Sequence, residues 1–90
     1  NTSIGEDCLI CGQVGISGSC RIGNRVVLAG GVGIADHTAI GDDAVVMAGA
    51  GVGQDVPAGA MVCGFPALPR EQFFEQQTYL RRLKRMFNDM

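Results

Sequence analysis

The segment VLAGGVGIADHTAIGDDAVV, which runs from Val27 to Val46, decides the fold. An aliphatic residue returns in it at every sixth position, and the same phase continues on both sides of the segment. The complete series is Ile4, Ile10, Ile16, Ile22, Leu28, Ile34, Ile40, Val46 and Val52. Ile, Leu and Val are a minority of the composition, so an unbroken series of this length in one phase arises by chance roughly once in a million sequences. The spacing is therefore a structural repeat.

A second series follows the first after four residues and consists of small or β-branched side chains. Its members are Cys8, Val14, Cys20, Val26, Val32, Thr38, Ala44, Ala50 and Val56. A period of six fits neither an α-helix nor simple strand alternation. It is typical of a short strand followed by a tight corner, and three such six-residue units close one triangular coil. We therefore predict an all-β fold, a left-handed parallel β-helix, with coils at 4–21, 22–39 and 40–57 stacked about 4.8 Å apart.

The glycine clusters Gly30-Gly31 and Gly49 to Gly53 fit the corners of such a coil. No Lys-Ser or Lys-Thr pair follows either cluster, so neither matches a phosphate-binding loop. A solenoid also needs neighbours at its ends, and the repeat is already in phase at Ile4. We therefore expect further coils upstream of Asn1.

The repeat fades after Val56, and residues 57–69 hold all the prolines of the chain, which predicts an irregular exit loop. From Arg70 onward apolar residues recur at helical steps, at Phe73, Leu80, Leu83, Phe87 and Met90. Glu71 near the start and the basic residues near the end suit the dipole of a helix. The sequence thus divides into a β-helix at 1–57, a loop at 58–69 and an amphipathic C-terminal α-helix at 70–90.

Composition excludes several classes of function. The net charge of −2 argues against a general nucleic-acid binder, and the absence of Trp argues against a base-stacking platform. The chain contains no apolar run long enough to span a membrane, and we expect a cytoplasmic protein. Cys8 and Cys11 form a C-x-x-C pair, but the repeat phase places Cys8 and Cys20 inside the coil. We interpret the cysteines as small core residues in a reducing compartment and expect no metal site.

Two groups of polar residues are candidates for function. His37 is the only histidine, and an 18-residue coil stacks it in one column with Asn1, Ser19 and Asp55. An imidazole at this outer edge can act as a base or bind a phosphate, or the column can be a solvated edge. A basic group on the expected helix is either a solvated face or a docking surface for an acidic protein. Its members are Arg81, Arg82, Lys84 and Arg85.

Beyond the repeat, the segments 32–37 (Val-Gly-Ile-Ala-Asp-His) and 64–67 (Gly-Phe-Pro-Ala) are more specific. Together with 13–16, 27–31, 40–46 and 55–59 they resemble the C-terminal half of the UDP-3-O-acylglucosamine N-acyltransferases. These enzymes act in lipid A synthesis in Gram-negative bacteria. The likeness covers nearly all 90 residues.

This resemblance implies a homotrimer with active sites between subunits. It implies a 3-hydroxyacyl donor carried as a thioester on acyl carrier protein, an acceptor 2-amine on UDP-3-O-acylglucosamine, and no separate cofactor. The base of the family is a His in an Ala-His-Asn motif, and Asn1-Thr2-Ser3-Ile4-Gly5 resembles the sequence directly after it. We therefore expect the base just before Asn1, outside this chain, and expect this segment alone to be inactive.

The same resemblance assigns roles to residues within the chain. It implies that the Gly18 backbone N–H donates to the thioester oxyanion and that Asn1 and His37 bind substrate. Gly49, Ala50 and Gly51 would leave an acyl groove open, and the basic group from Arg81 to Arg85 would receive the carrier protein. Two alternatives stay open: another hexapeptide acyltransferase with a different sugar or amino-acid acceptor, and a non-catalytic trimerisation scaffold. A γ-type carbonic anhydrase needs several His ligands, and this chain has one.

Overall fold

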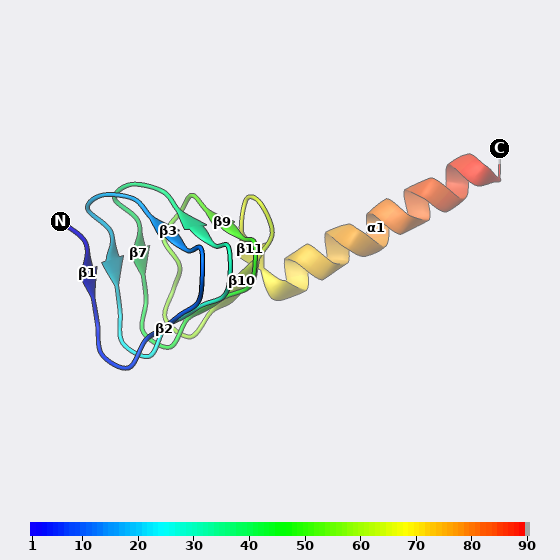
Figure 1. Ribbon diagram of the computed structural model, residues 1–90. Helices are drawn as coiled ribbons and strands as arrows, with labels where there is room; N and C mark the ends of the chain where they lie inside the picture. Colours follow the sequence, from blue (N-terminus) through cyan, green and yellow to red (C-terminus); the bar gives the residue numbers. More distant parts are fainter. Residues whose placement is uncertain (90) are drawn as a thin grey trace.

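The chain forms a triangular solenoid from which one long helix projects (Figure 1). The structure, a computed structural model, describes residues 1–89, so Met90 of the expected helix lies outside the described residues. The strands are β1 (Ser3–Ile4), β2 (Leu9–Ile10), β3 (Gly15–Ile16), β4 (Arg21–Ile22), β5 (Val27–Leu28), β6 (Gly33–Ile34), β7 (Ala39–Ile40), β8 (Val45–Val46), β9 (Gly51–Val52), β10 (Met61–Cys63) and β11 (Leu68–Pro69), and the helix is α1 (Arg70–Asn88).

Three flat sheets form the sides of the triangle. Their strand orders are β1-β4-β7, β2-β5-β8-β10-β11 and β3-β6-β9. Ile4 pairs with Ile22, and Ile22 pairs with Ile40, so the parallel register advances by one coil of the repeat. The predicted left-handed parallel β-helix with its three coils is confirmed.

The core is the inside of the triangle, and both predicted residue series fill it. From Cys20 onward every member of the two series is buried, ending with Val52 and Val56. Ile4 and Ile10 in the first coil are 49% and 38% exposed because only one of their two sides is covered by a neighbouring coil. Burying an aliphatic side chain of this size contributes about 1.5–3 kcal/mol, so stacking of coils supplies the main stabilisation.

The corners share one backbone conformation. From Cys8 to Ala50, the residue before each inward small side chain has a positive φ, and at six of these corners it is not glycine. Gln13, Ser19 and Arg25 have φ values of 61°, 60° and 56°, whereas glycines serve two further corners at Gly31 and Gly49. The left-handed conformation costs a non-glycine residue about 1–2 kcal/mol. The coil closure imposes it, since from Arg25 to Gly49 each of these corner N–H groups donates to a corner carbonyl one coil earlier, as Arg25 does to Glu6.

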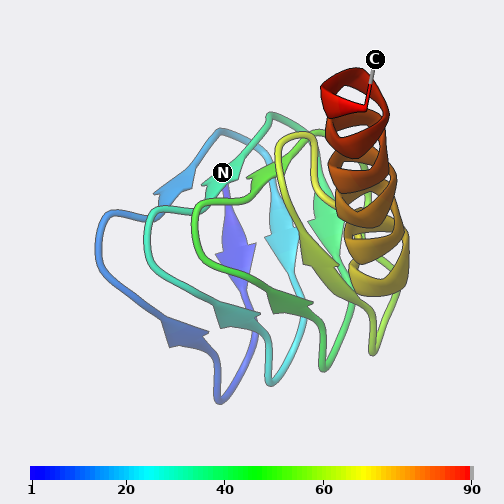
Figure 2. The ribbon, with the colours of Figure 1, turned by 90° about the vertical axis from the view of Figure 1, so that its right-hand side faces the viewer.

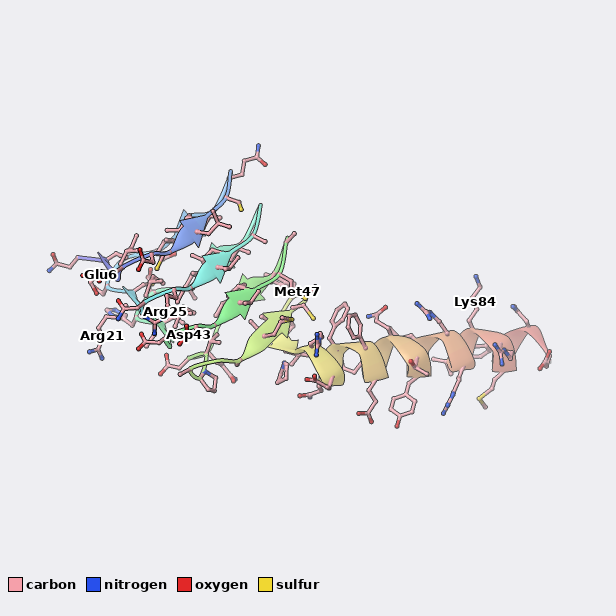
Figure 3. All side chains as sticks on the ribbon, turned by 90° about the horizontal axis from the view of Figure 1, so that it is seen from below. Glu6, Arg21, Arg25, Asp43, Met47 and Lys84 are labelled. Carbon is pink, nitrogen blue, oxygen red and sulfur yellow. The ribbon has the colours of Figure 1, made fainter. Side chains whose placement is uncertain are left out.

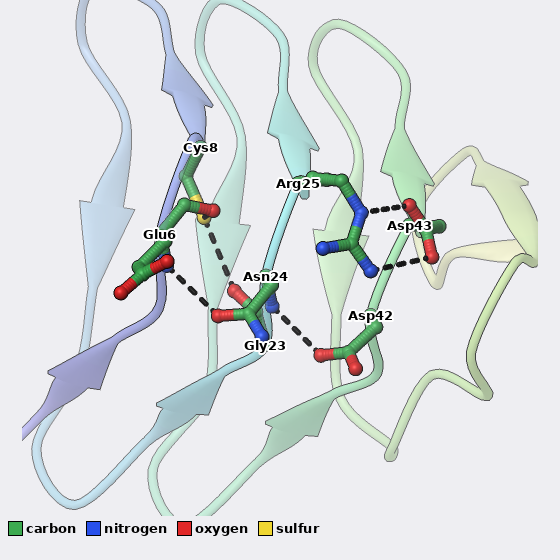
Figure 4. Close-up of polar contacts among 7 residues, drawn as sticks. All are labelled: Glu6, Cys8, Gly23, Asn24, Arg25, Asp42 and Asp43. Atoms are coloured by element: carbon green, nitrogen blue, oxygen red, sulfur yellow. Dashed lines mark hydrogen bonds and ion pairs between the residues drawn. The ribbon is translucent and has the colours of Figure 1, made fainter.

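A ladder of Asn and Asp side chains ties one edge of the triangle together (Figure 4). The Asn24 Oδ1 atom accepts from the Glu6 N–H at 2.9 Å, and the Asp42 Oδ1 atom accepts from the Asn24 N–H at 2.7 Å. These side chains fold over the glycines of the preceding coil, so a Cβ atom at Gly5 or Gly23 would collide with them. Glycine at these two positions is therefore a requirement of the ladder.

The structure differs from the sequence-based division after Val52. Val56 pairs with Ile40 and Val62 pairs with Val46, a register of 16 residues instead of 18. The corner between β9 and Val56 is thus two residues shorter than the others, and the Asp55 carboxylate accepts from the Ala39 N–H at 2.9 Å there. The solenoid consequently continues into a partial fourth coil up to Cys63, within the segment 58–69 that we expected to be an irregular loop.

The C-terminal helix leaves the end of the solenoid instead of packing along it (Figures 1 and 2). Strand β11 pairs antiparallel with β10 and leads directly into α1. Contacts of α1 are with β10 and β11, and none of its described residues is buried. The chain is accordingly elongated, with extents of 54 × 21 × 21 Å. The expected helix from Arg70 is present, with Glu71 in its first turn and Arg85 in its last.

Candidate functional site

The corner that carries His37 also holds Gly18, the other residue to which the sequence gave a role in the reaction. His37 is exposed, has a φ of 60°, and donates its backbone N–H to the Gly18 carbonyl oxygen at 3.1 Å. The Gly18 N–H in turn donates to the Asp36 Oδ1 atom at 3.1 Å. Gly18, Asp36 and His37 therefore form one hydrogen-bonded unit on two successive coils.

This unit changes the expectation for Gly18. Its N–H was expected to be open to a substrate oxyanion, but in this structure it already has the Asp36 carboxylate as its acceptor. Sequence reasoning missed Asp36, although the equivalent positions Asn24 and Asp42 show the same side-chain type at the third place of the repeat. The N–H becomes available only when the Asp36 carboxylate turns away.

The expected polar column is present in part. Ser19 and His37 occupy equivalent corner positions one coil apart. Asp55 does not continue the column, because its corner is shortened and its carboxylate is bound to the Ala39 N–H. Asn1 is exposed, and the neighbouring Thr2 hydroxyl donates to the Ser17 carbonyl at 3.1 Å, which fastens this end of the chain beside the Gly18 corner.

An open groove of about 520 Å³ runs over the outer face of the sheet β3-β6-β9. Its floor is a column of glycines in register, Gly15, Gly33 and Gly51. Ser17, Ala35 and Gly53 form a second column of small residues beside it, and Phe65 and Pro66 lie at the β9 end. Of the three residues expected to form an acyl groove, Gly51 lines this one. Ala50 is buried in the core and Gly49 forms the corner before β9.

A second groove, of about 470 Å³, follows the outer face of β1-β4-β7. Ser3, Arg21 and Ala39 lie in register along it, with Asp55 at its far end. Figure 3 shows Arg21 projecting from the solenoid, and within residues 1–89 it has no ion-pair partner. Arg25, at the corner that follows β4, is paired through its Nε atom with the Asp43 Oδ1 atom at 2.7 Å. This bond to Arg25 lowers the pKa of the Asp43 carboxyl below its ordinary value.

The helix α1 presents both charge and apolar surface. Its basic group, Arg81, Arg82, Lys84 and Arg85, is exposed and forms no ion pair with any described residue. The Arg82 guanidinium lies 5.8 Å from the centre of the Tyr79 ring, and the Tyr79 hydroxyl donates to the Glu75 Oε1 atom at 3.0 Å. This hydrogen bond to Glu75 raises the pKa of Tyr79. Leu80, Leu83 and Phe87 are also about half exposed or more.

The cysteines behave as core and surface residues. All four are free; Cys20 and Cys63 are buried, Cys8 is half-buried and Cys11 is exposed. The Sγ atoms of Cys8 and Cys20 donate to the Gly23 and Ala35 carbonyls at 3.1 Å. Burial raises the pKa of the Cys63 thiol. Across residues 1–89 no three His, Cys, Asp or Glu side chains come together in a way that could hold a metal ion.

Within residues 1–89, no helix is both long enough and apolar enough to cross a membrane. The candidates for function are the His37 corner, the two outer grooves and the exposed helix. They are four different parts of the solenoid and its helical extension.

The chain is similar to a known family over its first part. Residues 1–36 match the family described as "Bacterial transferase hexapeptide (six repeats)". The three-sided solenoid agrees with this match, so over residues 1–36 the chain is similar to the hexapeptide repeats of bacterial transferases.

The particular resemblance inferred from the sequence is confirmed over this segment. The chain is 65% identical over 85 residues to the UDP-3-O-acylglucosamine N-acyltransferase of Granulibacter bethesdensis, which covers 94% of this chain and 25% of that protein. It is 36% identical over 88 residues to the protein of the same name from Methylococcus capsulatus and 43% identical over 83 residues to that of Methylobacterium sp. strain 4-46. These matches cover 98% and 92% of this chain and 25% and 24% of the two relatives. The chain thus spans about a quarter of the length of the relatives it matches, and it corresponds to their C-terminal part.

Proposed function

We propose that this chain is the C-terminal part of an N-acyltransferase that moves a 3-hydroxyacyl chain from acyl carrier protein to the 2-amine of UDP-3-O-acylglucosamine. The observation that carries the proposal is the 65% identity, over 94% of the chain, to a protein named for this acceptor. The hexapeptide match supports transferase chemistry independently of that name.

The proposed reaction is an acyl transfer. The acceptor amine attacks the thioester carbonyl, a C–N bond forms, and the C–S bond breaks. The amine proton goes to a base, and the thiol of the carrier leaves as the protonated product. The base is the His expected directly before Asn1. Negative charge develops on the carbonyl oxygen during attack, and a fixed backbone N–H beside it lowers the barrier.

The His37 corner supports substrate positioning in this scheme. Gly18 lies one coil below His37 and offers the one N–H of this corner that points to a side chain instead of a backbone carbonyl. We propose that the arriving thioester oxygen replaces the Asp36 carboxylate at this N–H. His37, exposed and held by its own backbone hydrogen bond, would then contact the phosphate or sugar of the acceptor.

The donor and the assembly complete the proposal. Acyl carrier protein would carry the donor thioester and dock through acidic residues on the basic group of α1, and no other cofactor would be required. The acyl chain would lie in the groove over β3-β6-β9. The protein would act in the cytoplasm as a homotrimer. A register-aligned apolar column on the outside of β2, β5, β8 and β10 supports association between copies; it consists of Leu9, Val27, Val45 and Met61.

The test is an N-acylation assay on the protein extended upstream of Asn1 to the length of its relatives. Transfer from 3-hydroxyacyl carrier protein to UDP-3-O-acylglucosamine is expected, and His37→Ala should raise the KM for the acceptor by about tenfold or more. Gln13→Ala is the matched control, because Gln13 is an exposed corner residue with the same positive φ as His37 and lines neither groove. Transfer of acetyl groups from acetyl-coenzyme A alone would favour another hexapeptide acyltransferase. A trimer with no transfer to any acceptor would favour the scaffold.

A further inference from the structure

Phe65 is the most exposed large apolar residue of the solenoid, and the backbone fixes its position. It is 88% exposed and lies in the loop between β10 and β11. The Gly51 N–H donates to the Gly64 carbonyl at 3.0 Å, and the Ala67 N–H donates to the Gly51 carbonyl at 2.7 Å. Two backbone hydrogen bonds to one residue of β9 thus hold the loop on both sides of Phe65.

The Phe65 ring lies directly over Gly51. A Cβ atom built on Gly51 would collide with the ring, whereas a Cβ atom on Gly15 or Gly33 would meet nothing within 4 Å. The groove over β3-β6-β9 is therefore bare at two coils and covered by an aromatic ring at the third. The ring forms a wall at the β9 end of an otherwise open floor.

The groove has the shape of a site for a linear apolar chain. Its floor is glycine backbone flanked by small residues, so it offers no side chain that would recognise a branched or cyclic group. The in-register glycines make it straight, and two strand spacings separate Gly15 from Gly51, about 10 Å in all. An exposed phenyl ring at its end gains burial when methylene groups pack against it.

We propose that Phe65 sets the length of the acyl chain by closing the β9 end of this groove. The inference rests on the proposed N-acyltransferase function, because that function supplies the linear occupant. Phe65 is a specificity-determining residue in this scheme, and Gly51 is the position that allows its ring to lie across the groove. A substitution at Gly51 cannot test the groove by itself, since any added side chain displaces the ring.

The first test measures chain-length preference. Phe65→Ala and Phe65→Leu are compared with the unsubstituted protein, extended to the length of its relatives, on 3-hydroxyacyl carrier proteins of increasing length. Phe65→Ala is expected to raise kcat/KM for a donor two carbons longer than the preferred one by about tenfold relative to the preferred donor, with Phe65→Leu between. Phe74→Ala is the matched control, because Phe74 is a half-exposed phenylalanine on α1 that does not line the groove.

The second test does not need turnover. An acyl-pantetheine probe with a diazirine on the terminal carbon is bound to the unsubstituted protein and photoactivated. Labelling is expected on the peptides that contain Gly51 to Gly53 or Phe65. If these peptides are labelled but the protein shows no N-acylation in the assay above, the proposed function is wrong. The inference that an acyl chain ends at Phe65 in this groove would still hold.

Other outcomes overturn the inference. Labelling elsewhere would show that the chain end does not reach Phe65. An unchanged length preference in both Phe65 variants would show that the ring does not limit the chain. If Phe65→Ala instead lowers the oligomer mass in light scattering and leaves the preference unchanged, the ring is a contact between copies.

Discussion

At the scale of single residues, the hydrogen-bonding side chains at the third place of the repeat have two different consequences. Asn24 caps the Glu6 N–H and Asp36 caps the Gly18 N–H, each one coil below. Removing either cap leaves a corner donor without its acceptor, which costs about 1 kcal/mol. Only the second donor lies in the proposed site.

This pair gives a matched prediction. Asn24→Ala and Asp36→Ala should each lower the free energy of unfolding by about 1 kcal/mol in urea titrations. Asp36→Ala should also raise kcat for N-acylation several-fold, because it frees the Gly18 N–H and removes a carboxylate that repels the developing oxyanion. Asn24→Ala should leave kcat unchanged. A kcat for Asp36→Ala at or below that of Asn24→Ala would exclude Gly18 as the oxyanion donor.

The Arg25–Asp43 pair predicts an acid dependence of stability. Its hydrogen bond lowers the pKa of Asp43 in the folded state, so the pair stabilises the fold above the ordinary pKa of an Asp. That contribution is lost as the pH falls below the ordinary pKa of an Asp and through the lowered one. Asp43→Asn keeps the shape and tolerates the positive φ of this corner, but it removes the titration.

The measurement is the urea midpoint as a function of pH for the two proteins. The unsubstituted protein should lose more stability on acidification than Asp43→Asn, and the two curves should converge at the acid end. Because both side chains are more than half exposed, the difference is expected to shrink in high salt. Parallel curves would show that Asp43 does not contribute.

At the scale of elements, the repeat predicted the strands well and the corners poorly. The strand positions follow from which side chains face inward, and the six-residue phase states this directly for Ile22 or Val46. The corner conformations depend on hydrogen bonds between coils, which involve residues a whole coil apart, such as Asn24 and Asp42. A single coil read by itself carries no sign of them.

The shortened corner after Val52 shows the same limit. Val56, Ala60 and Val62 keep the spacing of four and six residues that defines the repeat, so the sequence did contain the fourth coil. It is shifted by two residues, and a fixed phase assigned Val56 to the end of the third coil.

In the candidate site, the sequence pointed to His37 and Gly18 but not to Asp36 or Phe65. The contacts of these two side chains are with Gly18 and Gly51, which are distant from them in the chain.

The exposed helix supports a prediction of its own. Five of the seven basic residues of the chain lie from Arg70 onward, whereas the solenoid carries most of the acidic ones. If acyl carrier protein docks on α1, the double reversal Arg82→Glu, Arg85→Glu should weaken carrier binding at least tenfold at low salt. Arg21→Glu is the control, since it makes the same type of change on the solenoid. Surface plasmon resonance against immobilised carrier would decide it, and equal affinities for all three proteins would discard the docking surface.

At the scale of the whole molecule, the exposed surfaces of the three sheets have different characters. The face of β3-β6-β9 is a glycine floor, and the face of β1-β4-β7 carries Arg21. The face of β2-β5-β8-β10 instead carries a continuous apolar column, in which Leu9 is 59% exposed. Side chains that the fold leaves uncovered in register along one face favour association through that face.

The last prediction tests this assignment of faces. Val45 lies in the middle of the apolar column, is half-buried, and points away from the core, so Val45→Glu adds a charge outside the fold. It should convert a trimer into monomers in light scattering, because an unpaired carboxylate cannot be buried between copies without a large desolvation cost. The far-ultraviolet circular dichroism should stay unchanged. Arg21→Glu, on the neighbouring face, should remain trimeric. If Val45→Glu is still a trimer and Arg21→Glu is not, the copies meet through the β1-β4-β7 face, and the groove beside Arg21 belongs to the interface.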